Sequence, residues 1–553
     1  MRQAGPKFET TDEVDFVIVG SGAAGGVLAK ELSSNGFRVV VLEQGPYLTP
    51  DQFDHDDLHV FFENALTNKP QLQPTTFRKT SPDKANPQPA VMYGRCVGGS
   101  SVHFTANYWR FHEIDFIERS KHGPVAGTGF ADWPIPYADL EPYYTKVEWE
   151  VGVSGLAGAS PFDPPRSKPY AYPPLPVKSG GVIFERAAQK LGWHPFPAPM
   201  AILSKPAAGR GACVHCGYCL GFGCEVGAKS STVASVIPIA ERTGRCEIRP
   251  DSNVFRIETN ERGRVTGVAY FDSQKRQQFQ KAKVVVVSAN GAETPRLLLL
   301  SASKLFPNGL ANSSGLVGKY LMPNSFLEVF GVYEHPLNDY KGAAVSRILH
   351  DFYEAGAQNG YCGGGGLDSR LAVTPVGFGL GGLPSDAPTW GSAYKSLLRE
   401  YFTRTMSVST HGTSLPVESN SFSLDPDLKD AWGLPALRVT YTDHPDDLKN
   451  TAFLMARALE IHQAAGARKT WHQPVQETQF FVHLLGTCRM GNDSKTSVIN
   501  ADHRAHDVPN LFLCDGSSFV TSGRGQPTMT IQALAYRAAD RITALAKRGD
   551  LSV

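Results

Sequence analysis

The sequence has almost no net charge and no long apolar run. Its 553 residues include 54 Lys and Arg against 53 Asp and Glu, a formal charge of +1, so no overall basic field points to nucleic acid or to an anionic membrane. No apolar stretch approaches the roughly 18 residues of a membrane helix, and we expect no membrane span. Residues 1–13 are polar and lack the apolar region of a secretory signal. The composition predicts a globular protein that is cytoplasmic unless a partner carries it elsewhere.

The chain contains strand–helix units that are typical of a parallel sheet. It opens with an apolar strand at Asp15–Val19, a helix at Ala23–Leu32 and a second strand at Phe37–Glu43. Continuous apolar strands of this kind are usually buried on both faces. Further strand–helix pairs are predicted at Lys283–Ser288 with Glu293–Ser301, and at Asn510–Cys514 with Thr528–Ala546.

The segments between these units differ in composition. Residues 155–178 are rich in Pro, Gly, Ser and Ala and mark a connection. Residues 331–420 favour strand pairs with long loops over helices, and a strand at Leu437–Tyr441 precedes a long helix at Pro445–Ala465. We predict an α/β protein in which a Rossmann-like dinucleotide-binding domain is interrupted by an inserted α+β substrate domain with an antiparallel sheet. The first domain is assigned residues 1–130, 213–325 and 480–553, and the second residues 131–212 and 326–479.

A glycine fingerprint follows the first strand. Gly20 allows the tight turn, Gly22 lets the backbone approach a pyrophosphate, and Gly25 permits close packing of helix on strand. Glu43 ends the second strand, where a carboxylate can hydrogen-bond ribose hydroxyls. The motif lies in the strand–turn–helix context that it requires, so it predicts a dinucleotide site, but it does not separate FAD from NAD.

Three further stretches resemble one family. Gly94–Phe104, Lys283–Leu300 and His483–Ile542 are together similar to the glucose–methanol–choline (GMC) oxidoreductases, in the order that this family uses. The resemblance implies FAD as the cofactor, and a hydride taken from a carbon that bears a hydroxyl group. Beside the fingerprint, the residues that it implies as FAD contacts are Arg95, Gly98, Gly99, Ser100, Val254, Asp515, Gly516 and Thr528.

The stretch Val97–Phe111 resembles a narrower branch of the family. That branch contains bacterial FAD glucose and gluconate dehydrogenases and, more distantly, pyranose oxidase. In pyranose oxidases a His near the position of His103 is bonded covalently to the flavin, whereas in the dehydrogenases the corresponding residue is not. His103 is therefore expected either to carry the flavin or to pack beside its ring, and Asn107 of the same stretch is predicted to contact the cofactor.

Two residues are predicted to act on the substrate. His483 begins a stretch that resembles the family's catalytic-histidine motif, and a histidine suits removal of the hydroxyl proton because its ordinary pKa is near 6.5. The family's partner position, usually His or Asn before Pro, holds Gln526 here. Its amide can still donate and accept, although the extra methylene must displace the substrate or the backbone. The neighbouring Arg524 is expected to steer an acidic or polyhydroxylated substrate or to be solvated.

Four cysteines fall within twelve residues of a glycine-rich loop, residues 211–229. Cys213, Cys216, Cys219 and Cys224 can converge on an iron–sulfur cluster, on zinc or in disulfides. The glucose and gluconate dehydrogenases that the chain resembles bind a 3Fe-4S cluster with a similar run. Cys213, Cys219 and Cys224 match that run best, and Cys216 is extra and could make the cluster 4Fe-4S.

The resemblance implies a dehydrogenase of a sugar or sugar derivative: an aldose, gluconate or a glycoside. Electrons would pass through the cluster to a cytochrome c, and a small partner subunit with an export signal would take the chain to the periplasm. The alternative is a pyranose-oxidase-like enzyme that uses oxygen and has no cluster. A third interpretation, a flavin-binding subunit without activity, is disfavoured by the intact His483.

Overall fold

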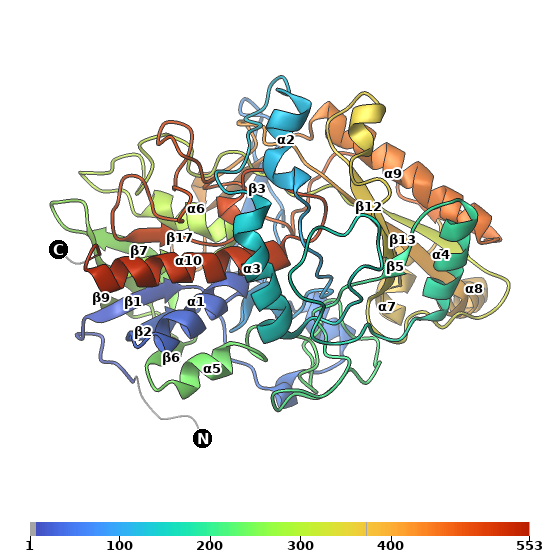
Figure 1. Cartoon of the computed structure of the whole chain (residues 1–553), viewed down its shortest axis with the longest axis horizontal. Coiled ribbons are helices and arrows are strands. Elements are labelled where there is room, and N and C mark those ends of the chain that lie inside the picture. The colour runs from blue at the N-terminus through green and yellow to red at the C-terminus, as the bar shows by residue number, and fades with distance from the viewer. Residues whose placement is uncertain (1–6, 372, 552–553) are drawn as a thin grey trace.

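The computed structural model describes residues 7–371 and 373–551, so the first six residues of the polar N-terminal segment lie outside it. A seven-stranded sheet forms one half of the molecule (Figure 1). β1 (Val14–Val19) lies between β2 (Val39–Leu42) and β9 (Gln277–Val287), and all three run parallel. Also in this sheet are β6 (Cys246–Arg249), β7 (Asn253–Thr259), β8 (Val265–Phe271) and β17 (Leu511–Leu513).

Helices cover this sheet. α1 (Ala23–Ser34) lies beside α10 (Thr528–Arg548), and α3 (Tyr137–Val147) lies against α10 in turn (Figure 1). The fully buried Val-rich strands β1 and β2 form the centre of the main core, as the continuous apolar runs predict. The sheet also contacts α5 (Ile237–Arg242) and α6 (Asn290–Leu300).

A second, six-stranded antiparallel sheet forms the other half. Its centre is β13 (Thr405–Gly412), between β10 (Glu328–Val332) and β12 (Gly365–Arg370). The outer strands are β5 (Phe196–Pro197), β11 (Val345–Leu349) and β16 (Lys469–His472), and the helices of this half are α4 (Ser179–Lys190), α7 (Pro375–Gly377), α8 (Gly391–Arg404) and α9 (Pro445–Ala464). The two sheets confirm the predicted fold class.

Helix α8 corrects the prediction for residues 331–420. We expected only strand pairs and loops there, but α8 forms fourteen residues of helix. Its sequence does carry an apolar stripe at helical spacing, namely Tyr394, Leu397, Leu398, Tyr401 and Phe402. The prediction overlooked this stripe because the glycines, prolines and short polar stretches of the region favour strands and loops. The strands β11, β12 and β13 of the same region agree with the prediction.

A small third sheet joins segments that are far apart in the chain. β15 (Pro435–Thr440) pairs in parallel with β3 (Thr75–Arg78), and β14 (Ser421–Lys429) and β4 (Asn86–Pro87) complete it. It therefore links a strand predicted for the substrate domain to one predicted for the nucleotide domain. The predicted domain boundaries themselves stay a prediction.

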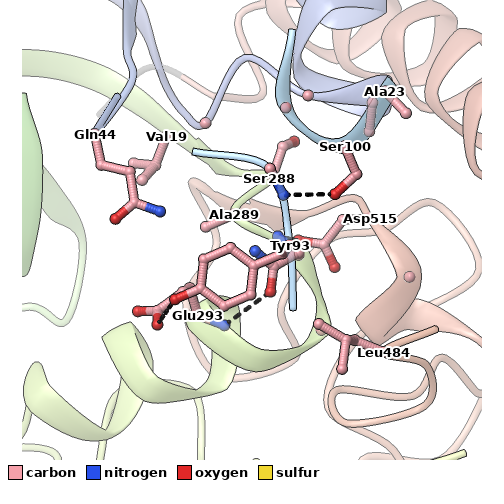
Figure 2. Close-up of a pocket in the computed structure, with 18 of the residues that line it drawn as sticks. Val19, Ala23, Gln44, Tyr93, Ser100, Ser288, Ala289, Glu293, Leu484 and Asp515 are labelled. Carbon is pink, nitrogen blue, oxygen red and sulfur yellow. Dashed lines mark hydrogen bonds between the residues drawn. The ribbon is translucent and has the colours of Figure 1, made fainter. Parts of the chain in front are cut away.

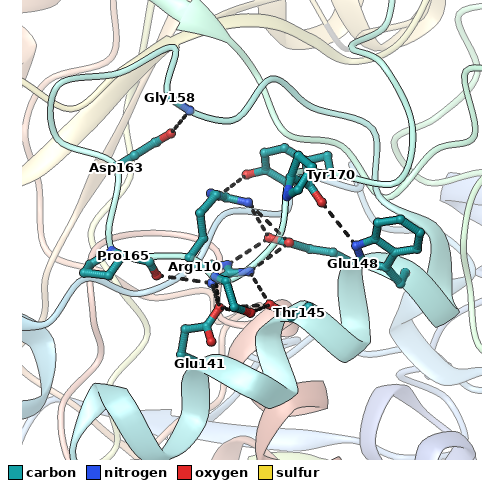
Figure 3. A network of polar contacts seen from close by, with 12 residues as sticks. Arg110, Glu141, Thr145, Glu148, Gly158, Asp163, Pro165 and Tyr170 are labelled. Carbon is teal, nitrogen blue, oxygen red and sulfur yellow. Dashed lines mark hydrogen bonds and ion pairs between the residues drawn. The ribbon is translucent and has the colours of Figure 1, made fainter.

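The proline-rich connection at 155–178 is held by a buried ion-pair network (Figure 3). The Arg110 guanidinium donates to Glu141 on α3, at 2.9 Å, and to Glu148 just beyond it, at 2.8 Å. Arg166 of the connection lies 3.3 Å from the same Glu148 carboxylate. Because Arg110 and Glu148 have fully buried side chains, this network fixes the path of the loop over α3.

Candidate active site

A cleft runs along the carboxyl ends of the parallel strands (Figure 2), and the space in it, including its part open to solvent, is about 1220 Å³. Gly20 has a φ of +91°, and a side chain at Gly25 would overlap the Gly20 carbonyl oxygen at 2.0 Å. A side chain at Gly22 would meet only the Gly99 Cα, at 3.8 Å. The three glycines thus have the roles that the sequence predicts: a turn, an open approach to the cleft and close packing.

Most predicted cofactor residues line this cleft. Glu43 is buried at its edge, where its carboxylate accepts hydrogen bonds from the Ser21 backbone N–H (3.1 Å) and hydroxyl (2.8 Å). Burial raises the pKa of Glu43, and these hydrogen bonds oppose the rise. The lining also includes Gly20, Gly22, Gly99, Ser100, Val254, His483, Asp515, Gly516 and Thr528. A long cleft with a glycine turn at one end and a histidine at the other fits an extended dinucleotide such as FAD.

The other predicted cofactor residues are not among those that line the cleft. Gly25 and Gly98 support the turn and the loop from behind, and the Arg95 guanidinium lies 5.9 Å from the ring centre of Trp432. His103 is buried, and its Nε2 has no hydrogen-bond partner among the described residues. Asn107 donates from Nδ2 to Asp368, on the antiparallel sheet, at 3.4 Å. The structure therefore brings Asn107 to the substrate side of the site.

Asp515 joins two of the family-like stretches. Its carboxylate accepts from the Asn290 backbone N–H at 3.1 Å and from the Thr294 hydroxyl at 2.6 Å, both at the start of α6. It also accepts from the Ser517 N–H at 2.8 Å. The stretches at 283–300 and 510–542 thus meet at one carboxylate beside the cleft.

His483 lies at the end of the cleft, in a segment that isolated bridges fix at Phe481 and Leu485. Its Nδ1 lies 3.1 Å from the side-chain oxygen of Asn324. The Asn324 amide nitrogen donates to three backbone carbonyls, those of Gly412, Ser522 and Gly523. Because the amide nitrogen already donates to these carbonyls, the group that faces the ring is the amide oxygen, which can only accept a hydrogen bond. The ring proton is therefore on Nδ1 and the lone pair on Nε2.

The charge state of His483 agrees with a role as a base. Burial, with His411 and Arg370 nearby, lowers the pKa of His483 to about 4. The imidazole is therefore neutral at neutral pH. A neutral ring with a fixed tautomer can accept a hydroxyl proton on Nε2 without first losing one.

The wall opposite His483 comes from the antiparallel sheet and was missed by sequence reasoning. Asp368 on β12 and His411 on β13 form a short hydrogen bond, and the Arg370 Nε donates to Asp368 at 2.6 Å. Glu328 on β10 shares this face, because it and Asp368 both pair with Ser409. Although burial opposes ionisation of Asp368, Arg370 and His411 hold its pKa at about 2. No local motif marks these residues, because cross-strand pairing alone brings them together.

Gln526 reaches this wall, and Arg524 does not. The Gln526 amide nitrogen lies 3.4 Å from the His411 Nδ1. The Arg524 side chain is only 1% exposed and forms ion pairs with Asp115, at 2.6 Å, and with Glu118. Both expectations for Arg524 are therefore wrong: two buried carboxylates hold it inside the protein, where it neither steers a substrate nor meets solvent.

The cysteine loop meets the segment that carries His103. The Gly221 N–H donates to the His103 carbonyl at 2.7 Å, and the Lys229 ammonium donates to the Phe104 carbonyl at 3.2 Å. All nine cysteines of the chain are free thiols. Cys219 is buried, Cys213 and Cys224 are half-buried, and Cys216 is exposed, with its sulfur within 4.8 Å of ligand atoms of His55 and Glu225.

Comparison with known proteins identifies the family. Models of the GMC oxidoreductase family match residues 14–321 and 416–535. The chain belongs to the GMC oxidoreductases. It is therefore an FAD-type oxidoreductase that acts on CH–OH groups, and the predicted family is confirmed.

Relatives match along the whole length. The chain is 36% identical to 2-methyl-1,2-propanediol dehydrogenase of Mycolicibacterium austroafricanum, over 97% of this chain and 96% of that protein. It is 30% identical to the fructose dehydrogenase large subunit of Gluconobacter japonicus, over 98% and 99%. Among solved structures, a formate oxidase of Aspergillus oryzae RIB40 superposes with a TM-score of 0.65 at 15% identity, over 98% and 99% of the two chains. The last similarity concerns the fold alone.

No helix among the described residues is long and apolar enough to span a membrane.

Proposed function

We propose that this oxidoreductase is a dehydrogenase of a sugar, a sugar derivative or a similar polyhydroxylated compound. The observation that carries the proposal is the pairing of a neutral, tautomer-fixed His483 with a polar wall on the substrate side. The names of two relatives, a diol dehydrogenase and a fructose dehydrogenase subunit, support a substrate with several hydroxyl groups.

The reaction divides between the cofactor and the protein. FAD, when bound in the cleft, supplies the acceptor for the hydride. His483 takes the hydroxyl proton on Nε2, and Asn324 holds the ring so that this nitrogen faces the cleft. Gln526, which lies against His411, can bind the substrate oxygen through its amide, while the carboxylate of Glu328 can accept hydrogen bonds from further hydroxyls. The polar side chains of Gln526 and Glu328 favour a polar substrate over an apolar alcohol, because an apolar one would give them no hydrogen-bond partner.

We also propose that the cysteine loop binds an iron–sulfur cluster that passes electrons onward. A backbone N–H faces each of the four sulfurs: that of His215 faces Cys213, Tyr218 faces Cys216, Ala344 faces Cys219 and Lys229 faces Cys224. Such N–H groups stabilise thiolates in cluster sites. Burial raises the pKa of Cys213 to about 11, so a bound metal is what would keep this sulfur ionised near neutral pH.

Lys229 gives an independent argument for thiolates over disulfides. Its side chain is only 2% exposed, and its ammonium donates to the carbonyls of Cys219 and Phe222 at 2.7 Å. Among the described residues no carboxylate pairs with it, and the charges that act on it belong to Cys219, Cys224 and Cys216. Burial lowers the pKa of Lys229, and anionic sulfurs nearby would raise it again, so a charged Lys229 requires a compensating anion. Thiolates around a cluster provide that anion, whereas neutral disulfides do not.

From the family resemblance we propose a small partner subunit and, through it, a periplasmic location. One relative is by its name a large subunit, which supports a multi-subunit assembly. Expression with and without a candidate small subunit, followed by fractionation of the cells, tests this proposal. Activity in the periplasm without any partner would contradict it.

The central test is metal and flavin analysis of anaerobically purified protein. We expect FAD, iron and acid-labile sulfide, and we expect a sugar or polyol to bleach the flavin and alter an iron–sulfur EPR signal. Zinc in place of iron would contradict the cluster. Iron-free protein that turns over with oxygen as fast as with artificial acceptors would favour the oxidase alternative.

A further inference from the structure

An exposed apolar patch covers the outer side of the cysteine loop. Leu58 and Phe62 lie four residues apart on one turn of helix and are each 57% exposed, and Val214 of the loop is 59% exposed. Leu220 of the loop is also exposed. Large apolar side chains gathered in this way on a soluble surface usually mark a contact with another molecule.

Residues 50–64 and the cysteine loop form one continuous surface. The Phe61 ring lies edge-on to Phe222 at 5.4 Å, and a side chain at Gly221 would overlap it. His55 stacks on Tyr218, with ring centres 4.0 Å apart. The turn of helix that carries Leu58 and Phe62 is therefore packed against the cysteine loop.

The charge of this surface is strongly negative. Residues 39–68 and 211–228 contain no Lys or Arg, although the whole chain has a charge of +1. The carboxylates on the two segments that meet here are Asp51, Asp54, Asp56, Asp57, Glu63 and Glu225. Among the described residues, none of these carboxylates forms an ion pair with Lys or Arg. The basic side chains that contact them are His55, beside Glu225, and His59, beside Asp54. Three basic residues lie beside this segment. Arg210 donates to the Gly227 carbonyl at 2.9 Å, Lys229 is buried, and Lys341 has its backbone against Gly217.

We propose that this surface, Leu58, Phe62, Val214 and Leu220 ringed by the six carboxylates, docks a basic one-electron carrier with an exposed apolar redox edge, such as a lysine-rimmed c-type cytochrome. The proposal rests on the cluster proposed above. A second copy of this chain would bring six carboxylates against six, which repel, and an anionic membrane would be repelled in the same way. A basic rim complements the carboxylates, and an apolar edge covers the patch.

Docking at this surface satisfies the electron balance of the reaction. Oxidation of one CH–OH group to C=O releases two electrons and two protons. Two carrier molecules each take one electron, so that each haem iron changes from ferric to ferrous, and the protons leave to solvent. The patch lies on the outer side of the loop, and the His103 segment contacts its inner side, so the loop lies between the cleft and the carrier.

The test uses iron-loaded full-length protein with a basic mitochondrial-type cytochrome c. The charge-reversal variant Asp51→Lys/Glu63→Lys alters two exposed carboxylates, and Phe62→Ala removes apolar surface. Glu261→Lys and Leu305→Ala, exposed residues beside the turn that joins β7 and β8, are matched controls. At low salt we expect charge reversal to slow cytochrome c reduction by about 10-fold or more, and to flatten its salt dependence.

Two further readouts separate docking from chemistry. Ferricyanide, an anion, should react faster with the charge-reversal variant, and flavin reduction by substrate should not change. Carbodiimide cross-links between carboxylates and cytochrome lysines should map to residues 51–63 and Glu225. The proposal is overturned if the cross-links map elsewhere, if the variants behave like their controls, or if the patch proves to be a dimer contact that Phe62→Ala disrupts. Iron-free protein would instead refute the cluster, which metal analysis detects separately.

Discussion

His483 and Lys229 of the cysteine loop are two polar centres of this protein, and they differ in how their side chains are partnered. At His483 the ring is held by Asn324, and the Asn324 amide is itself anchored by three carbonyls. In the loop, Lys229 has carbonyl partners and no carboxylate among the described residues. The buried Arg110 and Arg524 each have two carboxylates. The difference supports the proposal that a negatively charged cluster completes the loop, whereas the partners of His483 come from the protein alone.

The largest expected effect is at His483. His483→Ala should slow flavin reduction by substrate by about 10²–10⁴-fold, the usual contribution of a positioned base. FAD and iron content should stay unchanged, because His483 contacts neither the glycine turn nor the loop. Anaerobic stopped-flow bleaching measures the rate, and His472→Ala, on the outer strand β16, serves as the control. An unchanged rate in His483→Ala would show that another group takes the proton.

The two buried cations should respond differently to removal. Arg524→Met leaves Asp115 and Glu118 without their cation and should destabilise the protein by about 3–5 kcal/mol. Lys229→Met removes a charge that has no carboxylate partner, together with hydrogen bonds to the carbonyls of Phe104, Cys219 and Phe222. It should therefore destabilise the metal-free protein less than Arg524→Met does, by about 1–3 kcal/mol, while the iron content of the loaded protein should fall.

Thermal unfolding of metal-free and iron-loaded samples, together with iron analysis, measures these effects. If Lys229→Met destabilised the metal-free protein as much as Arg524→Met does, Lys229 would be fully stabilised without a bound cluster. The proposed difference between the histidine site and the cysteine loop would then be wrong.

The pH dependence of flavin reduction sharpens the account of His483. Because the pKa of His483 is lowered to about 4, the rate should stay level from neutral pH down to about pH 5 and fall only as the ring becomes protonated near pH 4. Asn324→Asp places a carboxylate beside Nδ1, which favours the imidazolium and should move the acid limb to higher pH. Rates of bleaching across the pH range test both. An acid limb near pH 6.5 in the wild type would mean that the ring is not buried as described.

The smallest expected effect is at Gln526. Gln526→Asn keeps the amide but shortens its reach toward His411, now 3.4 Å away, so the rate should change by only about 3–10-fold, as expected when a single neutral hydrogen bond is weakened. Gln526→Leu should have a larger effect, because it removes the amide. Steady-state KM and kcat for both variants are the measurement. Equal effects of the two would argue that Gln526 fills space and does not bind the substrate.

Local motifs were sufficient to predict the nucleotide half of this protein. A strand, a glycine turn and a helix are contiguous in the chain, so roles for Gly20, Gly22 and Gly25 could be predicted from spacing alone. The space around each glycine agrees with these roles, and the pyrophosphate contact stays a prediction. The long helices α9 and α10 were likewise predicted within a few residues, because one helix needs only its own periodic sequence. Helix α8 was missed although Tyr394, Leu397, Leu398, Tyr401 and Phe402 follow the helical period, because the composition of the surrounding region favoured strands and loops.

The substrate wall could be found only in the tertiary structure. Glu328, Asp368 and His411 come from three strands that are separated by more than 35 residues in the chain, and only the register of β10, β12 and β13 places them on one face. The same holds for Asn324, which fixes the tautomer of a histidine 159 residues away. Arg524 shows most clearly what the sequence could not predict. Whether its side chain reaches solvent or pairs with the buried carboxylates of Asp115 and Glu118 depends on tertiary contacts. The sequence by itself determined the cofactor cleft and the family, because their motifs are local, whereas tertiary contacts decided how the base is held and which side chains face the substrate.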